Sequence, residues 1–595
     1  MLGPIFAREF RTVPRRAGHY GMRAAFLGLL WTLGLTAWLA TGGLGEDPQI
    51  GATARFGVLL FQVLTFVLVT LLTFFAALSA ASTVAQEKDR RTFLLLLLSD
   101  LRDYEIVLGK LLGSLLPIIL ILLGTLPVLA LLLLLGGITP GQVVQSWLIV
   151  ATTALAAGSL GGLISLWRDR TFQSLALSVI ALVLYFCAVR ALGAFGSGEW
   201  NHATVWLDPF RALQAVLEPP DERTPGIAPV WIFMAVMVGW SIALNAWGIY
   251  KLRHWNPGGE PIQQRESPTD EDQTDRVHAH AAPGRAREVW ANPIVWREIR
   301  TRAYGRRPLL VKSAYFLVLA LIVYAALSPL LDGQRIPFAA GYGLVPVTIL
   351  SLLLVAAQAV TAITSERDGG ALDLLLVTDL SPKEFIFGKL GGVLYNTKEY
   401  AIPPLLLAAT YAILGFLATP PANRPQLAAS MNAANLAAVW GAILILLAFV
   451  LVLGVHIALR VTNSRQAVTN ALGTVFFLSV GTLVCIYLIL INGGTFEYQF
   501  ISFSMFIVLG IGGLWWVLSA DRPTQALTLA AVMLPIAMFY CVTNVLVATP
   551  GSQESAPPLV PFLALLIPFG HAILAMLVPM LSEFDVAFGR TRMEE

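Results

Sequence analysis

Two clusters of charged residues interrupt a chain that is otherwise mostly apolar, and the second cluster repeats the first 279 positions later. They read QEKDRRTFLLLLLSDLRDYEIVLGKL (residues 86–111) and SERDGGALDLLLVTDLSPKEFIFGKL (residues 365–390). The repeated members are Glu87, Asp89, Asp100, Glu105 and Lys110 in the first copy and Glu366, Asp368, Asp379, Glu384 and Lys389 in the second. Two identical spacings in one chain indicate an internal duplication.

Neither cluster has the composition of a catalytic site. A phosphate-binding loop needs G-x-x-x-x-G-K followed by Ser or Thr, whereas YEIVLGKLLG and KEFIFGKLGG lack the upstream glycine and place leucine after the lysine. The chain also contains no H-E-x-x-H or G-x-S-x-G motif. Its three cysteines lie in apolar runs, which indicates small core residues rather than metal ligands. We therefore expect no catalytic residues, no metal and no cofactor in this chain, and no nucleic-acid binding.

The composition indicates an all-α polytopic membrane protein. Of its 595 residues, 57% are hydrophobic and 13% are charged, and the mean hydropathy is +0.73, whereas soluble domains carry about 25% charged residues. Continuous apolar runs of about 20 residues predict helices that cross the hydrocarbon core. We predict fourteen of them, six and then eight, at about 23–41, 57–82, 111–136, 143–166, 172–195, 229–250, 309–331, 340–363, 390–418, 435–459, 466–491, 499–519, 524–548 and 559–581.

The distribution of positive charge predicts the orientation. With the N-terminus inside, the predicted cytoplasmic segments contain 32 of the 39 lysines and arginines, and the opposite loops contain five. We therefore expect a multi-pass protein of the cell (cytoplasmic) membrane with both termini in the cytoplasm. Both clusters then lie on the cytoplasmic side.

A second repeat precedes the first span of each half. GPIFAREFRT (residues 3–12) is similar to NPIVWREIRT (residues 292–301). Each copy predicts an interfacial helix, with apolar residues in the acyl boundary and charged residues toward headgroups; alternatively, each is a basic flank that only sets topology. The charged members of the two helices are Arg8, Glu9, Arg11, Arg297, Glu298 and Arg300.

The repeats predict four parts of the chain. Residues 1–252 form a first transmembrane half, 253–290 a polar linker rich in Pro and Gly, and 291–520 a second transmembrane half. Residues 521–595 add two further transmembrane helices and a tail. Within the second half, Lys398 and Glu399 either line a polar pathway or mark a third span that starts later, around Tyr400. Pro403 and Pro404 are expected to kink or break a helix there.

The pattern of Glu, Arg or Lys, a short leucine-rich helix, an acid and Gly-Lys resembles the cytoplasmic loop of type-2 ABC exporter permeases. The resemblance covers most of each half, to about residues 250 and 519, and the chain looks like two permeases fused. It implies that each short helix couples the spans to a cytoplasmic ATPase subunit, which holds the ATP and magnesium. The residues that it assigns to this coupling are the repeated acids and lysines above, together with Arg367. Arg90 and Arg91 stand where the second copy has Gly369 and Gly370.

Two other classes of protein stay open. An ion-coupled secondary transporter also uses internal repeats, although its acids lie at the membrane midplane. A membrane scaffold that binds the same ATPase without moving a substrate is the other alternative. The expected partners are ABC ATPase subunits and membrane lipids, and the sequence does not identify a transported substrate.

Overall fold

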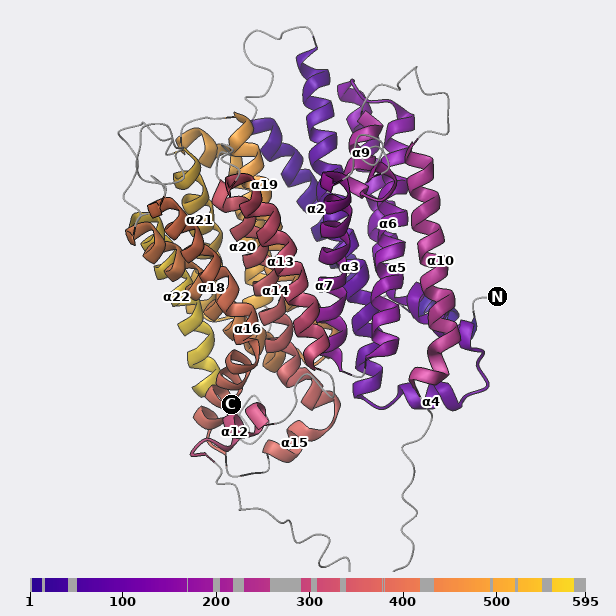
Figure 1. The fold of residues 1–595 in the computed structure, drawn as a ribbon, viewed down its shortest axis with the longest axis vertical. Helices are drawn as coiled ribbons and strands as arrows, with labels where there is room; N and C mark the ends of the chain where they lie inside the picture. Colours follow the sequence, from indigo (N-terminus) through magenta and orange to yellow (C-terminus); the bar gives the residue numbers. More distant parts are fainter. Residues whose placement is uncertain are drawn as a thin grey trace, which may run out of the picture.

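The chain folds into one bundle of long helices (Figure 1). The computed structural model describes residues 3–582 except 13–16, 41–50, 169, 196–203, 218–228, 257–289, 301–307, 332–338, 377, 379, 418–432, 493–495, 520–522 and 548–558. The first half contains α1 (Gly3–Thr12), α2 (Ala17–Ala40), α3 (Ala52–Asp89), α4 (Phe93–Leu98), α5 (Asp103–Leu131), α6 (Pro140–Trp167), α7 (Thr171–Phe195), α9 (Pro209–Leu217) and α10 (Pro229–Trp255). The rest contains α12 (Pro293–Arg300), α13 (Pro308–Leu331), α14 (Ala339–Asp368), α15 (Ala371–Leu376), α16 (Pro382–Leu417), α18 (Ala433–Arg460), α19 (Ser464–Asn492), α20 (Phe496–Ser519), α21 (Gln525–Val547) and α22 (Leu559–Ser582).

Twelve helices of the described residues are long and apolar enough to cross a membrane, and the prediction of an all-α polytopic membrane protein is confirmed. The other two predicted spans are also helical. The first lies in α2, whose apolar part, Arg23–Leu39, is shorter. The ninth lies in α16, which carries Lys398 and Glu399 before its apolar stretch. Pro403 and Pro404 do not break α16, which runs through both.

The two halves lie side by side in Figure 1, and packing within one half recurs in the other. The N-terminal helix of each half packs against its third long helix, α1 on α5 and α12 on α16. Likewise α3 packs on α6, and α14 on α18. Between the halves, α7 contacts α13 and α2 contacts α20, and the rings of Phe74 and Phe476 lie 4.9 Å apart. The short helices α4 and α15 lie at the lower end of the bundle, and α9 lies at the upper end.

The last helix, α22, occupies a place in the second half that resembles the place of α10 in the first. α10 packs against α6, where the Ser159 and Ser241 hydroxyls are 2.6 Å apart. α22 packs against α18, where the rings of Phe449 and Phe569 meet edge to face with centroids 5.0 Å apart. By contrast, α20 packs against α21 and α2. The hairpin α20–α21 therefore contacts α19 and α22 of the second half and α2 of the first half.

Truncation of Phe569 tests whether α22 belongs to the core of the second half. Phe569 is fully buried against α18, so Phe569→Ala leaves a cavity that costs about 3–5 kcal/mol. Ile567 lies on the same helix and is 60% exposed, so Ile567→Ala is the matched control. We expect thermal unfolding in detergent to shift for the first variant only. Equal melting temperatures for both variants would show that α22 is an accessory helix.

Candidate functional site

The repeated acid–base–acid triplet ends the second long helix of each half. Glu87, Lys88 and Asp89 end α3, and Glu366, Arg367 and Asp368 end α14. Consecutive side chains of an α-helix point about 100° apart, so three consecutive residues can contact three different neighbouring helices. The structure brings each of the three to a different helix, in the same way in both halves.

The central cation of the triplet binds the carbonyl end of the fourth long helix. Lys88 Nζ donates to the Leu166 carbonyl at 2.6 Å and to the Arg168 carbonyl at 3.0 Å, at the end of α6. Arg367 donates to the carbonyls of Val461 (2.7 Å) and Ala458, at the end of α18. The last carbonyls of a helix lack backbone donors and carry partial negative charge. A lysine or arginine side chain at this position supplies both the missing hydrogen-bond donors and a positive charge.

The second acid of the triplet binds the start of the fifth long helix. Asp89 accepts a hydrogen bond of 2.5 Å from the hydroxyl of Thr171, the first residue of α7. Asp368 accepts one of 2.9 Å from the hydroxyl of Ser464, the first residue of α19. A carboxylate is favourable at the positive end of a helix dipole. The triplet thus ties the end of one helix and the start of the next to a single point.

The first acid of the triplet pairs with the lysine of the third long helix. Glu87 pairs with Lys110 of α5, and Glu366 pairs with Lys389 of α16 at 2.6 Å. Lys389 is fully buried and Lys110 is nearly so. The lysine of the Gly-Lys pair therefore points into the bundle in both halves.

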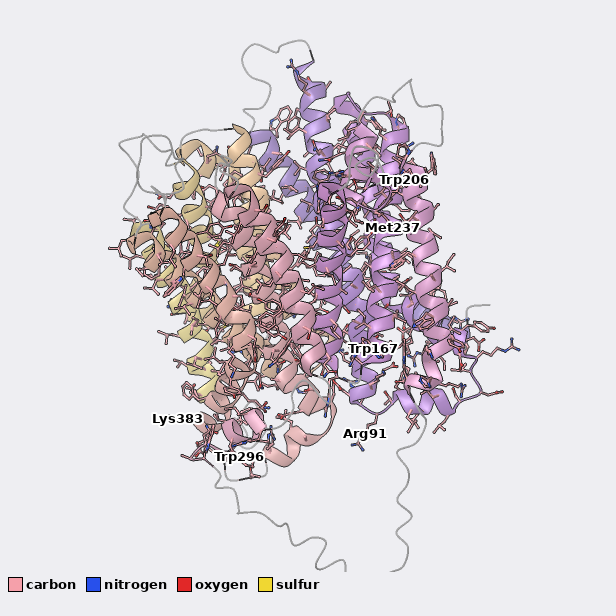
Figure 2. All side chains as sticks on the ribbon, viewed as in Figure 1. Arg91, Trp167, Trp206, Met237, Trp296 and Lys383 are labelled. Carbon is pink, nitrogen blue, oxygen red and sulfur yellow. The ribbon has the colours of Figure 1, made fainter. Side chains whose placement is uncertain are left out.

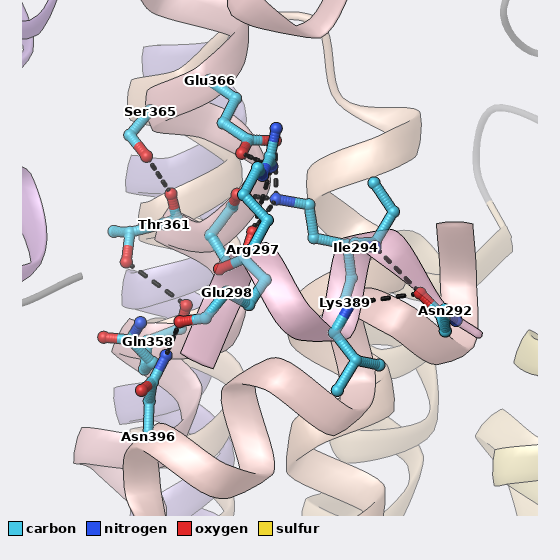
Figure 3. A network of polar contacts seen from close by, with 12 residues as sticks. Asn292, Ile294, Arg297, Glu298, Gln358, Thr361, Ser365, Glu366, Lys389 and Asn396 are labelled. Carbon is cyan, nitrogen blue, oxygen red and sulfur yellow. Dashed lines mark hydrogen bonds and ion pairs between the residues drawn. The ribbon is translucent and has the colours of Figure 1, made fainter. Parts of the chain in front are cut away.

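In the second half, the N-terminal helix α12 completes a buried ion cluster (Figure 3). Lys389 pairs with Glu298 at 2.7 Å and donates to the Ala362 carbonyl at 3.1 Å, and Arg297 pairs with Glu366. Two cations and two carboxylates balance one another. Burial alone raises the pKa of the Glu298 carboxyl, but Lys389 and Arg297 beside it hold that pKa below its ordinary value.

Glycines let each N-terminal helix approach the third long helix closely. An added Cβ at Gly388 would lie 2.6 Å from the Ile294 Cβ, and one at Gly392 would collide with Glu298. In the first half, Cβ atoms at Gly109 and Gly113 would crowd Ile5 and Glu9. The spacing is G-x-x-x-G around each lysine, the signal of close helix packing that identifies these glycines from sequence. The N-terminal helix α12 starts with the Asn292 side chain accepting from the amides of Ile294 (3.0 Å) and Val295 (3.1 Å).

The remaining predicted residues have other positions. Glu105 and Glu384 cap the third long helices, through the amide of Arg102 (3.0 Å) and the amide and hydroxyl of Ser381 (3.0 and 2.7 Å). The Ser381 bonds lower the pKa of Glu384. Lys398 is exposed, 3.8 Å above the Tyr395 ring, and Glu399 pairs with Lys312 of α13 at 2.5 Å. On the N-terminal helices, Arg8, Arg11 and Arg300 are exposed. Asp100 is exposed, and Asp379 lies outside the described residues.

The short helix α4 presents an apolar face to its surroundings. Phe93 and Leu97 are buried against the ends of α3 and α5, whereas Leu94, Leu95 and Leu98 are 40%, 66% and 69% exposed. Exposed apolar patches of this kind mark contact sites for another protein or a membrane. The sequence predicted that the short helix couples to a partner and grouped the charged residues with it. In the structure most of these charged residues point inward, whereas the three leucines of α4 point outward.

The residue after the first triplet contacts the second triplet across the halves. The Arg90 guanidinium pairs with Asp368 at 3.0 Å, and Arg465 of α19 donates to the Ser79 hydroxyl of α3 at 3.0 Å. Asp368 therefore receives Ser464 from its own half and Arg90 from the other. This contact was not predicted, because the repeat shows which residues are equivalent and not which residues of the two copies touch.

Residues 23–254 match a family model whose description is ABC-2 family transporter protein. The match runs from the apolar part of α2 to the end of α10, so it covers the spans of the first half. It confirms the resemblance for that half of the chain, which is similar to ABC-2 family transporter proteins. A search of curated proteins gives no match.

Removal of the buried lysine should be more damaging than removal of an exposed one. Lys389→Met leaves Glu298 and Glu366 buried with one fewer cation, and breaking a buried pair costs about 3–5 kcal/mol. The control is Lys383→Met, at an exposed position of the same helix. We expect the first variant to unfold at lower denaturant in detergent and the second to match the wild type. Equal midpoints would contradict the ion cluster.

Glu298 should make stability depend on pH. Because its native pKa lies below the ordinary value of 4.5, its stabilising effect is complete above that pH and is lost as the pH falls through the native pKa. We expect Glu298→Gln to be less stable at pH 7 and to show a flatter decline between pH 5 and pH 3, followed by thermal unfolding.

The matched control for this pH dependence is Glu9→Gln at the equivalent position of the first half. Glu9 pairs with Arg8, which is 68% exposed, so this substitution should change the profile little. Parallel profiles for wild type and Glu298→Gln would contradict the assignment.

Proposed function

We propose that this ABC-2-type membrane permease is an exporter driven by separate cytoplasmic ATPase subunits, which dock on α4 and α15. The observation that carries the proposal is the direct junction between each short helix and a triplet. Only three residues separate α3 from α4, and two separate α14 from α15. Because these connections are short, a displacement of α4 or α15 would also displace the triplet that precedes it.

The triplet would pass that displacement to several helices at once. In the first half it holds the end of α3 together with α5, the end of α6 and the start of α7, through Lys110, Leu166 and Thr171. In this interpretation, the exposed leucines make the contact and the charged residues behind them transmit the motion. These charged residues are Glu87, Asp89, Lys110, Glu366, Arg367, Asp368 and Lys389. The acids Asp100, Asp379, Glu105 and Glu384 flank the contact or cap the helix that follows it.

The orientation follows from the same proposal. Docking of a cytoplasmic ATPase requires the end of the bundle with α4 and α15 to face the cytoplasm, as the positive-charge count predicts. The protein would then lie in the cell membrane with both termini inside, and α1 and α12 at the membrane surface. ATP and magnesium would bind the partner.

We further propose that the chain is a fusion of two permease halves, 1–252 and a second half from residue 291, joined by the 253–290 segment. The equivalent contacts of the two triplets and of the two N-terminal helices support it. Sequence reasoning ended the second half at 520 and made 521–595 an addition. The packing of α22 against α18 favours α22 as the counterpart of α10, with α20–α21 as an inserted hairpin.

A pathway role for Lys398 and Glu399 stays a prediction. The Glu399 carboxylate faces Lys312 on α13, which satisfies its charge within the second half. A lining residue would have to break this pair to meet a substrate. The proposal therefore does not depend on these two residues.

Replacement of the exposed leucines of α4 tests the docking. Burying a leucine on binding contributes about 1.5–3 kcal/mol, so Leu95→Ala with Leu98→Ala should weaken ATPase binding by at least about 100-fold. The control is Leu134→Ala, 84% exposed at the opposite end of the first half. The measurement is co-isolation of a nucleotide-binding subunit with the purified permease, followed by its affinity in nanodiscs.

Two results would overturn the proposal. Unchanged ATPase affinity in the double leucine variant would remove α4 as the docking element. Transport driven by a proton or sodium gradient without ATP would favour an ion-coupled transporter, and ATPase binding without any substrate movement would favour a scaffold.

A further inference from the structure

The turn between α3 and α4 places an arginine in a backbone conformation that favours glycine. Arg91 has φ +60°, and it is the one non-glycine residue with positive φ among the described parts of the chain. Its counterpart 279 positions later is Gly370, with φ +70°. Both turns therefore need a left-handed residue, and the second half supplies it without the steric penalty that an L-residue pays.

Contacts among the described residues do not account for arginine at this position. Its backbone amide donates to the Lys88 carbonyl at 3.0 Å, a bond that glycine makes equally well, as Gly370 does to Arg367 at 3.1 Å. The Arg91 side chain is exposed, and Figure 2 shows it reaching away from the lower end of the bundle. Arg90 beside it behaves differently, because its guanidinium pairs with Asp368. Strained residues persist where they serve a function.

Only Thr92 separates Arg91 from the start of α4, which carries the exposed leucines. Three residues separate Arg91 from Leu95, and Leu94 and Leu98 extend the same exposed surface. A partner that covers these leucines meets the guanidinium at its border. The complementary surface is an apolar groove with a carboxylate at its rim, because Arg and carboxylate form charge-assisted, bidentate hydrogen bonds.

We propose that Arg91 is a specificity-determining contact that pairs with a carboxylate on the ATPase subunit docked on α4. The inference rests on the proposed function, since it presupposes an ATPase at this helix. Gly370 has no side chain to make the same contact at α15. The two docking sites of the chain are therefore not equivalent, and the first half alone selects an ATPase surface that carries an acid.

The test compares stability and ATPase affinity in the same variant. Arg91→Gly relieves the backbone strain and removes the charge, so we expect an equal or higher melting temperature together with about tenfold weaker binding of the co-isolated ATPase in nanodiscs. Arg91→Lys should retain part of the affinity. The affinity of the wild type should fall more steeply with salt than that of Arg91→Gly.

The control is Lys383→Gln, which removes one exposed positive charge from the second half at the same end of the bundle. Affinity of Arg91→Gly within twofold of the wild type, with the double leucine variant weakened, would refute this inference and leave the proposed function intact. Unchanged affinity in both would refute the proposed function. A loss that appears only in nanodiscs with anionic lipids, and not in neutral ones, would assign Arg91 to lipid headgroups and also refute the inference.

Discussion

The architecture of the second half depends on keeping one buried ammonium ion satisfied. Lys389 is fully buried, and a charge taken out of water is tolerated only where partners and hydrogen bonds replace the water. Glu366 comes from the end of α14 and Glu298 from α12, so satisfying the lysine fixes three helices relative to one another. The glycines at 388 and 392 are a consequence of this requirement, because α12 must approach α16 closely enough for Glu298 to reach Lys389.

In the first half, fewer charged residues surround the equivalent buried lysine. Lys110 pairs with Glu87, while Glu9 lies against Gly113 and pairs with the exposed Arg8. The N-terminal helix α1 thus packs at the equivalent position on α5, but weaker electrostatic interactions hold it there. Conversely, the first half contributes Arg90, which pairs with Asp368 of the second half. The two halves share the arrangement of helices and glycines, and they differ in the charges around it.

Much of the fold follows from the sequence alone. Apolar runs of membrane length located the spans, and Asn292 before Pro293 located the start of α12, because these signals are local. The constant offset of 279 residues paired the two clusters. Local signals do not tell which way a charged residue points. The sequence assigned Glu366, Arg367 and Asp368 to coupling without showing which neighbours they contact. Each is satisfied by a different helix of the same chain, and those helices meet only in the folded bundle.

The inward direction of the triplets clarifies how a short helix can act on long ones. If the charged residues faced the ATPase, docking would compete with water for exposed ions, and exposed ion pairs contribute little. With the ions turned inward, the exposed surface of α4 includes three leucines. In the proposed function, their burial would drive association and the charges behind them would transmit the displacement. The three consecutive residues of the triplet bind three different helices. A shift of α4 therefore cannot move one helix end without straining the bonds to the others. The ends of α3, α5, α6 and α7 are then expected to move as a unit, which is the property that a mechanical connection between a motor and a membrane bundle requires.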